Sequence, residues 1–222
     1  MMEIIPGVFQ EKTAIVNWYL IAEDHQITMI DTGVQSTYRQ AIKLVQSLGR
    51  QISDLTRIFL THADMDHVGA AMALMKASGA KITASQIAAD ALSDGQSSRS
   101  LKMGILTPLF DRIEHLGGGM QVDVEEIVSE GQILPILGGL KVIETPGHTP
   151  GHISFYSVEH QLLFAGDAVR NKPGAVGYNW FKVTNWDHGI MRKSVHKLAA
   201  LKPEIVCCGH GPVVFNAADK FP

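Results

Sequence analysis

The stretch FLTHADMDHVG, residues 59–69, places two histidines and two aspartates within six positions, between an apolar run and a run of small residues. Imidazole nitrogens and carboxylate oxygens are ligands that zinc, manganese and iron take in proteins. His62 and Asp64 are two residues apart, so in an extended loop their side chains face the same way. Asp66 and His67 are consecutive and diverge, which suits two neighbouring metal ions better than one.

A helix N-terminus is the alternative interpretation of the two aspartates. Aspartate is a preferred N-cap residue, and a helix is expected to begin near Val68. On this interpretation Asp64 or Asp66 caps that helix. Capping explains one aspartate, but it explains neither the two histidines nor the polar residues at distant strand ends.

Residues with metal-binding side chains recur along the chain where apolar runs end. Five runs of strand-like composition each lead into a tight turn that carries an aspartate or a histidine, at Asp31, His62, His148, Asp167 and His210. Glycines in these turns let the backbone bend sharply. In layered α/β proteins the loops after neighbouring strands converge at one edge of the sheet, and sites assemble there. The pattern therefore predicts one metal site built from five strand ends.

The order of elements favours an α/β fold with two sheets and helices outside them. Apolar runs predict strands over residues 17–22, 26–31, 56–61, 140–145, 153–158, 161–166 and 204–209. Helical spacing of apolar residues predicts helices over residues 38–48, 68–78 and 191–199. We expect a single domain over residues 1–222. Within it, residues 85–130 show broken helical spacing, and this segment is expected to cap a pocket, to bury a dimer interface or to pack into the core.

Composition excludes several classes of protein. The formal net charge of −3 argues against a general nucleic-acid binder and against an electrostatic membrane anchor. No apolar run approaches the length of a membrane span, and the opening residues MMEIIPGVFQ lack the features of a signal peptide. The two cysteines, Cys207 and Cys208, are adjacent and cannot join distant parts of the chain. We therefore expect a cytoplasmic protein whose partner is a small-molecule substrate. A homodimer is also expected if residues 85–130 form a dimer interface.

At these positions the sequence resembles the metallo-β-lactamase-fold hydrolases. THADMDH at 61–67 is similar to their T-H-x-H-x-D-H signature, and TPGHTPGH at 145–152 is similar to their second histidine block. DTG at 31–33, GDA at 166–168 and GHGP at 209–212 are similar to the remaining motifs, in the family's order. The resemblance implies a four-layer αβ/βα sandwich with two mixed β-sheets and outer helices, and a two-metal centre along its upper edge.

The resemblance also implies which residues hold two divalent metal ions, with zinc the first expectation. The first ion is expected on His62, His148 and Asp167, and the second on Asp66, His67 and His210, with Asp167 bridging. Asp31 is expected to orient a ligand without binding metal itself. Of the two TPGH histidines, His148 directly follows a strand and is the expected ligand. His152 opens the next strand and is expected to be structural.

Asp64 departs from the family pattern, which usually has histidine at this position. A carboxylate is shorter than an imidazole, so Asp64 reaches a metal ion only if the loop moves inward or a water molecule intervenes. As a ligand it would reduce the positive charge of the centre and weaken the metal ions as Lewis acids. It would also favour manganese or iron over zinc. The alternative is that Asp64 does not bind metal and that the first site is weak or empty.

The chemistry that the resemblance implies is metal-assisted hydrolysis, in which a metal-activated water attacks an ester, a lactone or a thioester. Asp66 and Asp167 are the expected catalytic residues, because Asp66 would orient the water and Asp167 would bridge the ions. One alternative is a di-iron or mononuclear-iron oxidoreductase, since the flavodiiron proteins of this superfamily carry a carboxylate at the position of Asp64. The other alternative is a degenerate metal-binding protein.

The segment after Asp167 is expected to form the rim of the substrate pocket, with Arg170, Tyr178 and Trp180 as candidate contacts. The alternative places the charge in solvent and the rings in the core. Acyl-homoserine lactonases have a tyrosine shortly after the bridging aspartate, where Arg170 stands here, so a lactone is disfavoured. Glyoxalase II-like thioesterases have a helical extension after the last histidine, whereas this chain ends at Pro222, so a glutathione thioester is disfavoured as well.

Overall fold

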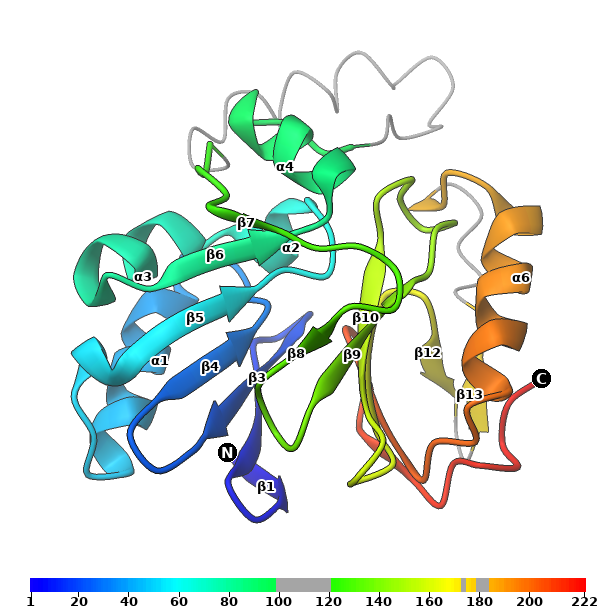
Figure 1. Ribbon diagram of the computed structural model, residues 1–222, viewed down its shortest axis with the longest axis horizontal. Helices are drawn as coiled ribbons and strands as arrows, with labels where there is room; N and C mark the ends of the chain where they lie inside the picture. Colours follow the sequence, from blue (N-terminus) through cyan, green and yellow to red (C-terminus); the bar gives the residue numbers. More distant parts are fainter. Residues whose placement is uncertain (99–120, 173–174, 179–183) are drawn as a thin grey trace.

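Two mixed β-sheets form the centre of the molecule in the computed structural model, which describes residues 1–98, 121–172, 175–178 and 184–222 (Figure 1). Within these residues the first sheet has seven strands in sequence order: β1 (Met2–Ile5), β2 (Val8–Lys12), β3 (Asn17–Ala22), β4 (Ile27–Ile30), β5 (Leu55–Phe59), β6 (Lys81–Ala84) and β7 (Glu126–Ile127). Strands β1 to β4 pair antiparallel, and β4 to β7 pair parallel.

The second sheet has six strands in the described part of the chain, in the spatial order β15-β14-β11-β10-β9-β8. They are β8 (Ile133–Leu134), β9 (Leu140–Glu144), β10 (Ile153–Ser157), β11 (Leu162–Gly166), β14 (Ile205–Cys208) and β15 (Val214–Phe215). Strands β11 and β14 pair parallel, and the other neighbours pair antiparallel. Strands β12 (Arg170–Lys172) and β13 (Ala175–Gly177) form a separate antiparallel pair.

Helices cover the outer face of each sheet (Figure 1). Helices α1 (Thr37–Ser47) and α3 (Ala71–Ser78) lie outside the first sheet, and α6 (His188–Ala199) lies outside the second. Leu44 joins an apolar cluster with the first sheet, and Met191 joins another with the second. The predicted four-layer αβ/βα sandwich is therefore confirmed. Among the described residues, the structure contains no helix with the length and apolar character needed to cross a membrane.

An apolar layer between the two sheets holds the halves of the sandwich together. Phe59 of β5 stacks on Phe155 of β10, and Tyr19 of β3 meets Phe164 of β11 edge-on, each pair with ring centroids 5.4 Å apart. All four rings are buried. Burial of one such ring stabilises a fold by about 1.5–3 kcal/mol. These pairs therefore fix how the strand ends of one sheet lie against those of the other.

Most of the predicted elements are confirmed. Each of the seven predicted strands corresponds to an observed one, and the helices predicted over 38–48 and 191–199 correspond to α1 and α6. Strands β2 and β6 are among those that the apolar runs did not indicate. Strand β2 ends in the polar residues QEK, and β6 has only four residues, so neither forms a long apolar run.

The helix predicted over 68–78 is wrong in one respect, because it is broken near its start. Helix α2 (Met65–Val68) ends before Gly69, and α3 begins at Ala71. The amide of Gly69 donates to the carbonyl oxygen of Gly33 at 2.9 Å. A Cβ atom at Gly69 would lie 2.7 Å from the backbone nitrogen of Gln35. The close approach of the loop after β4 therefore breaks the helix and sets the direction of α2.

The segment 85–130 is described in part. Its first helix, α4 (Gln86–Ser93), buries Ala88 and Leu92 in the cluster under the first sheet, so this portion packs as core. Its last portion supplies β7 at the edge of that sheet. The apolar residues on which the cap and dimer predictions depend lie within 99–120, outside the described residues. Those two predictions stay predictions.

Candidate metal centre

The strand ends that the sequence singled out meet at one place in the structure. Asp31 follows β4 and His62 follows β5 in the first sheet. His148 follows β9, Asp167 follows β11, and His210 follows β14 in the second sheet. Hydrogen bonds, ion contacts and ring contacts link these residues across the seam between the sheets. The predicted convergence of strand ends is therefore observed.

The end of β14 packs directly against the end of β11. The amide of Gly209 donates to the carbonyl oxygen of Gly166 at 2.8 Å. A Cβ atom at Gly209 would collide with Oδ1 of Asp167 and lie 2.7 Å from Cε1 of His67. Glycine is therefore required at position 209 for these two side chains to lie where they do.

The seven residues predicted to bind metal form overlapping groups. His62, Asp64 and His148 make a first donor group, and Asp66, His67 and His210 make a second. A third set, His62, His67 and Asp167, connects the two. Within each set the candidate ligand atoms all lie within 4.8 Å of one another.

In the first donor group, Nε2 of His148 lies 3.1 Å from Oδ2 of Asp64 and 3.4 Å from Oδ2 of Asp167. Nε2 of His62 lies 3.6 Å from Oδ2 of Asp64. A tetrahedral ion with bonds of about 2.0–2.2 Å keeps its ligands about 3.3–3.6 Å apart. The separations in this group are therefore close to those that a single divalent ion imposes on its ligands.

In the second donor group, Nε2 of His210 lies 3.5 Å from Oδ2 of Asp66 and 3.2 Å from Oδ2 of Asp167. Nε2 of His67 lies 3.4 Å from Oδ1 of Asp167 and 3.9 Å from Oδ2 of Asp66. Asp167 thus contacts members of both groups. Its position is that of a carboxylate shared by two neighbouring ions.

The four imidazoles all point Nε2 into the site, because a second group holds each Nδ1. The pairs are His62 with the Thr61 hydroxyl at 2.9 Å, His67 with the Asp31 carboxylate at 2.8 Å, His148 with Oδ1 of Asn185 at 3.0 Å, and His210 with the carbonyl oxygen of Ile15. Carboxylate and carbonyl oxygens only accept hydrogen bonds, so Nδ1 carries the proton in the last three pairs. The Thr61 hydroxyl donates to Asp31 and therefore accepts from His62. In the neutral imidazoles each Nε2 then presents a lone pair.

Three buried polar atoms of the site have no hydrogen-bond partner in the part of the chain that the structure describes. They are Nε2 of His62, Nε2 of His67 and Oδ1 of Asp167. An unsatisfied buried group of this kind costs about 1–3 kcal/mol. When the two histidines are neutral, these three atoms direct lone pairs toward one another, and a cation satisfies such an arrangement. The donor set therefore fits divalent metal ions.

Asp31 holds this arrangement in place through hydrogen bonds to Thr61 and His67. Its Oδ1 accepts from the Thr61 amide at 2.8 Å, and its Oδ2 accepts from the Thr61 hydroxyl at 2.9 Å and from His67. The backbone of Asp31 has φ of 56°, which is uncommon for a residue with a side chain. These contacts are those expected of a residue that orients His67 directly and His62 through Thr61.

The charges of the site favour bound positive charge. Burial raises the pKa of Asp167, but the imidazoles of His148, His210 and His67 outweigh burial and hold that pKa well below its usual range. Burial lowers the pKa of His67, but the carboxylates of Asp31, Asp66 and Asp167 outweigh burial and hold it well above its usual range. The carboxylates that retain a proton on His67 in this way also attract a metal cation.

Comparison with known proteins agrees with this geometry. The pattern of the metallo-beta-lactamase superfamily matches residues 13–210. The chain belongs to this superfamily. The metallo-beta-lactamase superfamily includes metal-dependent hydrolases such as hydroxyacylglutathione hydrolases and beta-lactamases.

Relatives in the superfamily match nearly the whole chain. GloC of Haemophilus influenzae, a hydroxyacylglutathione hydrolase, is 29% identical over 99% of this chain and 94% of that protein. YobT of Bacillus subtilis, named as an uncharacterised protein, is 30% identical over 92% of this chain and 87% of that protein. A solved metallo-beta-lactamase from Cronobacter sakazakii is 26% identical, with a TM-score of 0.73 over 95% of this chain and 77% of that chain. Its described motif, HARLDQ, also lacks histidine at the third position, which is the position of Asp64 in HADMDH here.

The capping interpretation of Asp64 is wrong for this superfamily member. Asp64 stands at the N-cap position of α2, but its side chain accepts no hydrogen bond from the helix. Its Oδ1 instead accepts from the hydroxyl of Ser97 at 2.7 Å, and its Oδ2 faces the nitrogens of the first donor group. The loop therefore brings the short carboxylate inward, as direct metal binding requires.

His152 is occupied by structural hydrogen bonds, as the sequence indicated. Its Nε2 accepts from the amide of Asp167 at 3.0 Å, and its Nδ1 pairs with the hydroxyl of Thr145 at 2.8 Å. Burial and the nearby imidazoles of His62 and His148 hold the pKa of His152 well below its usual range. The neutral ring thus positions the turn that carries Asp167, and both of its nitrogens are in use.

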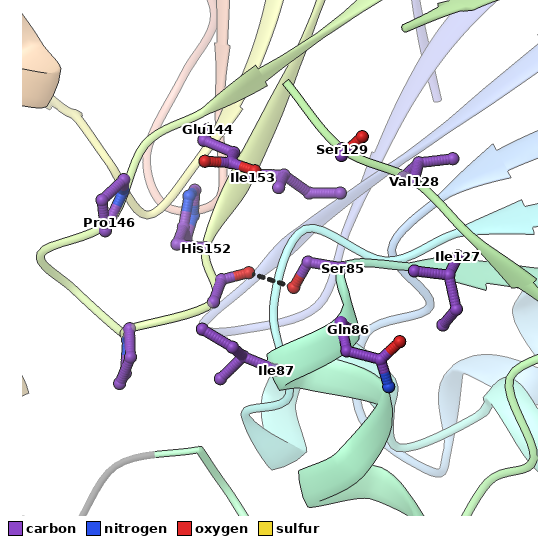
Figure 2. A pocket seen from close by; sticks show the side chains of 12 residues that line it. Ser85, Gln86, Ile87, Ile127, Val128, Ser129, Glu144, Pro146, His152 and Ile153 are labelled. Carbon is purple, nitrogen blue, oxygen red and sulfur yellow. Dashed lines mark hydrogen bonds between the residues drawn. The ribbon is translucent and has the colours of Figure 1, made fainter. Parts of the chain in front are cut away.

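A cavity of about 220 Å³ lies beside His152, between the start of α4 and the turn before β10 (Figure 2). The hydroxyl of Ser85 donates to the carbonyl oxygen of Gly151 at 2.6 Å and bridges the two walls. None of the predicted metal ligands lines this cavity. The Ser85 contact therefore joins the two halves of the sandwich, and the cavity lies outside the donor groups.

Two of the three candidate rim residues lie in the part of the chain that the structure describes. Arg170 begins β12, three residues after Asp167 in the chain. Tyr178 packs against α6, with its ring 6.5 Å from that of His196 and 5.6 Å from the guanidinium carbon of Arg192. Trp180 lies outside the described residues. The contacts of Tyr178 are thus those of a packing residue, and the rim stays a prediction for Arg170 and Trp180.

Several supporting residues escaped the sequence analysis. Asn185, Ser97 and Ile15 contact His148, Asp64 and His210 respectively, and none of the three belongs to a motif with recognisable spacing. Thr61 was visible as the residue before His62, but its link between His62 and Asp31 was not. Only the three-dimensional proximity of distant loops reveals these contacts.

Proposed function

We propose that the protein is a metal-dependent hydrolase of a small activated acyl compound, with a thioester as the first candidate and an ester or a lactone as the others. The observation that carries the proposal is the pair of donor groups joined by Asp167, in which buried atoms of His62, His67 and Asp167 have no hydrogen-bond partner among the described residues. The GloC relative supports the thioester, because a protein named as a hydroxyacylglutathione hydrolase matches over 94% of its length. A glutathione thioester is therefore no longer disfavoured, because this relative is matched without an additional domain of comparable size.

The residues of the two groups would hold two divalent ions. His62, Asp64, His148 and Asp167 would bind the first, and Asp66, His67, His210 and Asp167 the second. Bound there, such ions supply a strong nucleophile at neutral pH and polarise the carbonyl group under attack. Zinc is the first candidate, and manganese and iron follow because of Asp64.

The side chains of the site would have different roles in the reaction. Asp66 and His210 are partly exposed, with 31% and 16% of their side chains accessible, so the second donor group marks the open side where a substrate enters. Asp66 would orient the attacking water and receive its proton there. Asp167 keeps its charge at neutral pH because its pKa is low, so it acts as a ligand and not as an acid.

The charge of the centre also favours an activated substrate. Two divalent ions with the carboxylates of Asp64, Asp66 and Asp167 leave a formal charge of +1, against +2 with histidine at position 64. A less positive centre is a weaker Lewis acid. A thioester carbonyl needs less polarisation than an oxygen ester, so it tolerates this loss.

The test combines metal analysis with a matched pair of substrates. We would measure metal content of protein purified without added metal or chelator, and then hydrolysis of a thioester and an oxygen ester of the same acyl group. About two zinc or manganese ions per chain and faster cleavage of the thioester are expected, with activity lost in chelator. Bound iron with redox-active spectra would instead identify the iron oxidoreductase. One metal ion per chain without hydrolysis would identify the degenerate metal-binding protein.

The remaining expectations from composition belong to the same proposal. They are a cytoplasmic location, a small-molecule partner and no nucleic-acid or membrane partner. A homodimer through residues 85–130 is tested by sedimentation of the purified protein.

A further inference from the structure

The two carboxylate oxygens of Asp64 have different surroundings. Oδ1 accepts a hydrogen bond from the Ser97 hydroxyl at 2.7 Å. Oδ2 lies 3.1 Å from Nε2 of His148 and 3.6 Å from Nε2 of His62. The side chain of Asp64 is only 9% exposed, so this arrangement is largely shielded from water.

A glycine turn at the end of α4 brings Ser97 to this place. The helix ends at Ser93, and Gly95 adopts φ of 69°, in the left-handed region that glycine occupies without strain. The amide of Gly95 donates to the carbonyl oxygen of Leu92 at 3.1 Å, and the amide of Gln96 donates to that of Ala91 at 2.8 Å. This closure reverses the chain after the helix. It places the Ser97 hydroxyl within hydrogen-bond distance of Asp64, which lies 33 positions earlier in the sequence.

The hydrogen bond removes the freedom that distinguishes a carboxylate from an imidazole. An aspartate is able to rotate and to offer either oxygen, or both, to a metal ion. A hydrogen bond to a charged group is stronger than one between neutral groups, so it favours one orientation of the carboxylate. With Oδ1 held by Ser97, Oδ2 alone faces His148 and His62.

We propose that Ser97 is a positioning residue that makes Asp64 a single-oxygen ligand of the first metal ion. The inference rests on the proposed metal centre. It assigns to this chain a first site with two imidazole nitrogens, from His62 and His148, and two carboxylate oxygens, from Asp64 and Asp167. Ser97 compensates for the missing histidine by holding the shorter Asp64 side chain close to the imidazoles of His62 and His148.

The test is a metal titration of three serine variants. Ser97→Ala removes the hydroxyl, Ser97→Thr keeps it, and Ser93→Ala is the matched control, because the Ser93 hydroxyl donates only to the carbonyl oxygen of Asp90 among the described residues. Loss of a group that orients a ligand typically lowers metal affinity about 10- to 100-fold. We expect a loss of this size in Ser97→Ala at one of two sites, with a changed cobalt absorption spectrum. Ser97→Thr and Ser93→Ala are expected to bind as the parent does.

A double-mutant cycle with Asp64→His separates positioning from a general effect on the fold. If Ser97 acts through the Asp64 carboxylate, Ser97→Ala lowers affinity in the parent and has no effect in the Asp64→His background. Equal losses in both backgrounds, or no loss in the parent, would overturn the inference. Melting temperatures of the metal-free variants report whether each chain folds.

The same titration distinguishes failure of this inference from failure of the proposed function. A parent protein that binds two ions and is insensitive to Ser97→Ala leaves the hydrolase proposal intact and removes the role of Ser97. A parent protein that binds no metal removes both.

Discussion

The two donor groups share Asp167 but differ in burial and in ligand type. His62, Asp64 and His148 are all buried, whereas Asp66 and His210 are partly open to solvent. The open group keeps the residue types of the family signature, and the buried group contains the departure at Asp64. The departure thus lies in the donor group that is further from solvent. In this chain the change from the family signature is confined to the more buried donor group.

Asp167→Asn is the strongest test, because it removes the charge that both groups share. We expect both ions to be lost and kcat/KM to fall about 1000-fold, which corresponds to about 4 kcal/mol. Elemental analysis and kinetics on the thioester measure the two effects. Asp90→Asn, an exposed change on α4, is the control. Retention of two ions would show that the groups are independent of Asp167.

Asp31→Asn tests whether Asp31 orients ligands of both donor groups, His67 directly and His62 through Thr61. Asparagine replaces one acceptor oxygen by a donor, so it cannot satisfy His67 and both Thr61 donors together. We expect metal affinity to fall about 10- to 100-fold at both sites. A loss confined to one site would show that the Thr61 link does not reach His62.

Metal removal tests whether the partly exposed donor group loses its ion more easily than the buried one. Because His210 and Asp66 are partly exposed, a chelator is expected to take the second ion at about tenfold lower concentration than the first. Loss of an ion bound at 1000 times its Kd costs about 4 kcal/mol, and a chain of this size melts about 2–4 °C lower for each kcal/mol. Cobalt absorption and melting curves along a chelator series measure the order. Release of both ions at the same chelator concentration would show that the difference in burial does not control metal loss.

Asp64→His is expected to have the smallest effect. It restores an imidazole to the first group and raises its formal charge by one. We expect selectivity for zinc over manganese to rise about tenfold in the first site, with the second unchanged. Competition between the two metals, followed by elemental analysis, measures this ratio. An equal change at both sites would contradict separate control of the inner ion.

The sequence predicted the layers of the fold and the seven candidate ligands, because both depend on local patterns. Apolar runs identify strands, and motif residues at their ends identify the edge where side chains converge. The contacts that hold the ligands depend on distant loops instead. Ile15 reaches His210 across 195 positions, and no local pattern marks it. The break at Gly69 has the same origin, because the amide of Gly69 donates to the carbonyl oxygen of Gly33, in a loop from elsewhere in the chain.

The hydrogen bond between Ile15 and His210 also sets the order in which the centre is assembled. The two partners are separated by 195 positions in the sequence. The second donor group is complete only after β14 has docked beside the loop that carries Ile15. Contacts of such sequence separation form late in folding. Loading of the second donor group would therefore report that the loop with Ile15 and the end of β14 have come together, so a protein truncated before β14 is expected to leave this group incomplete.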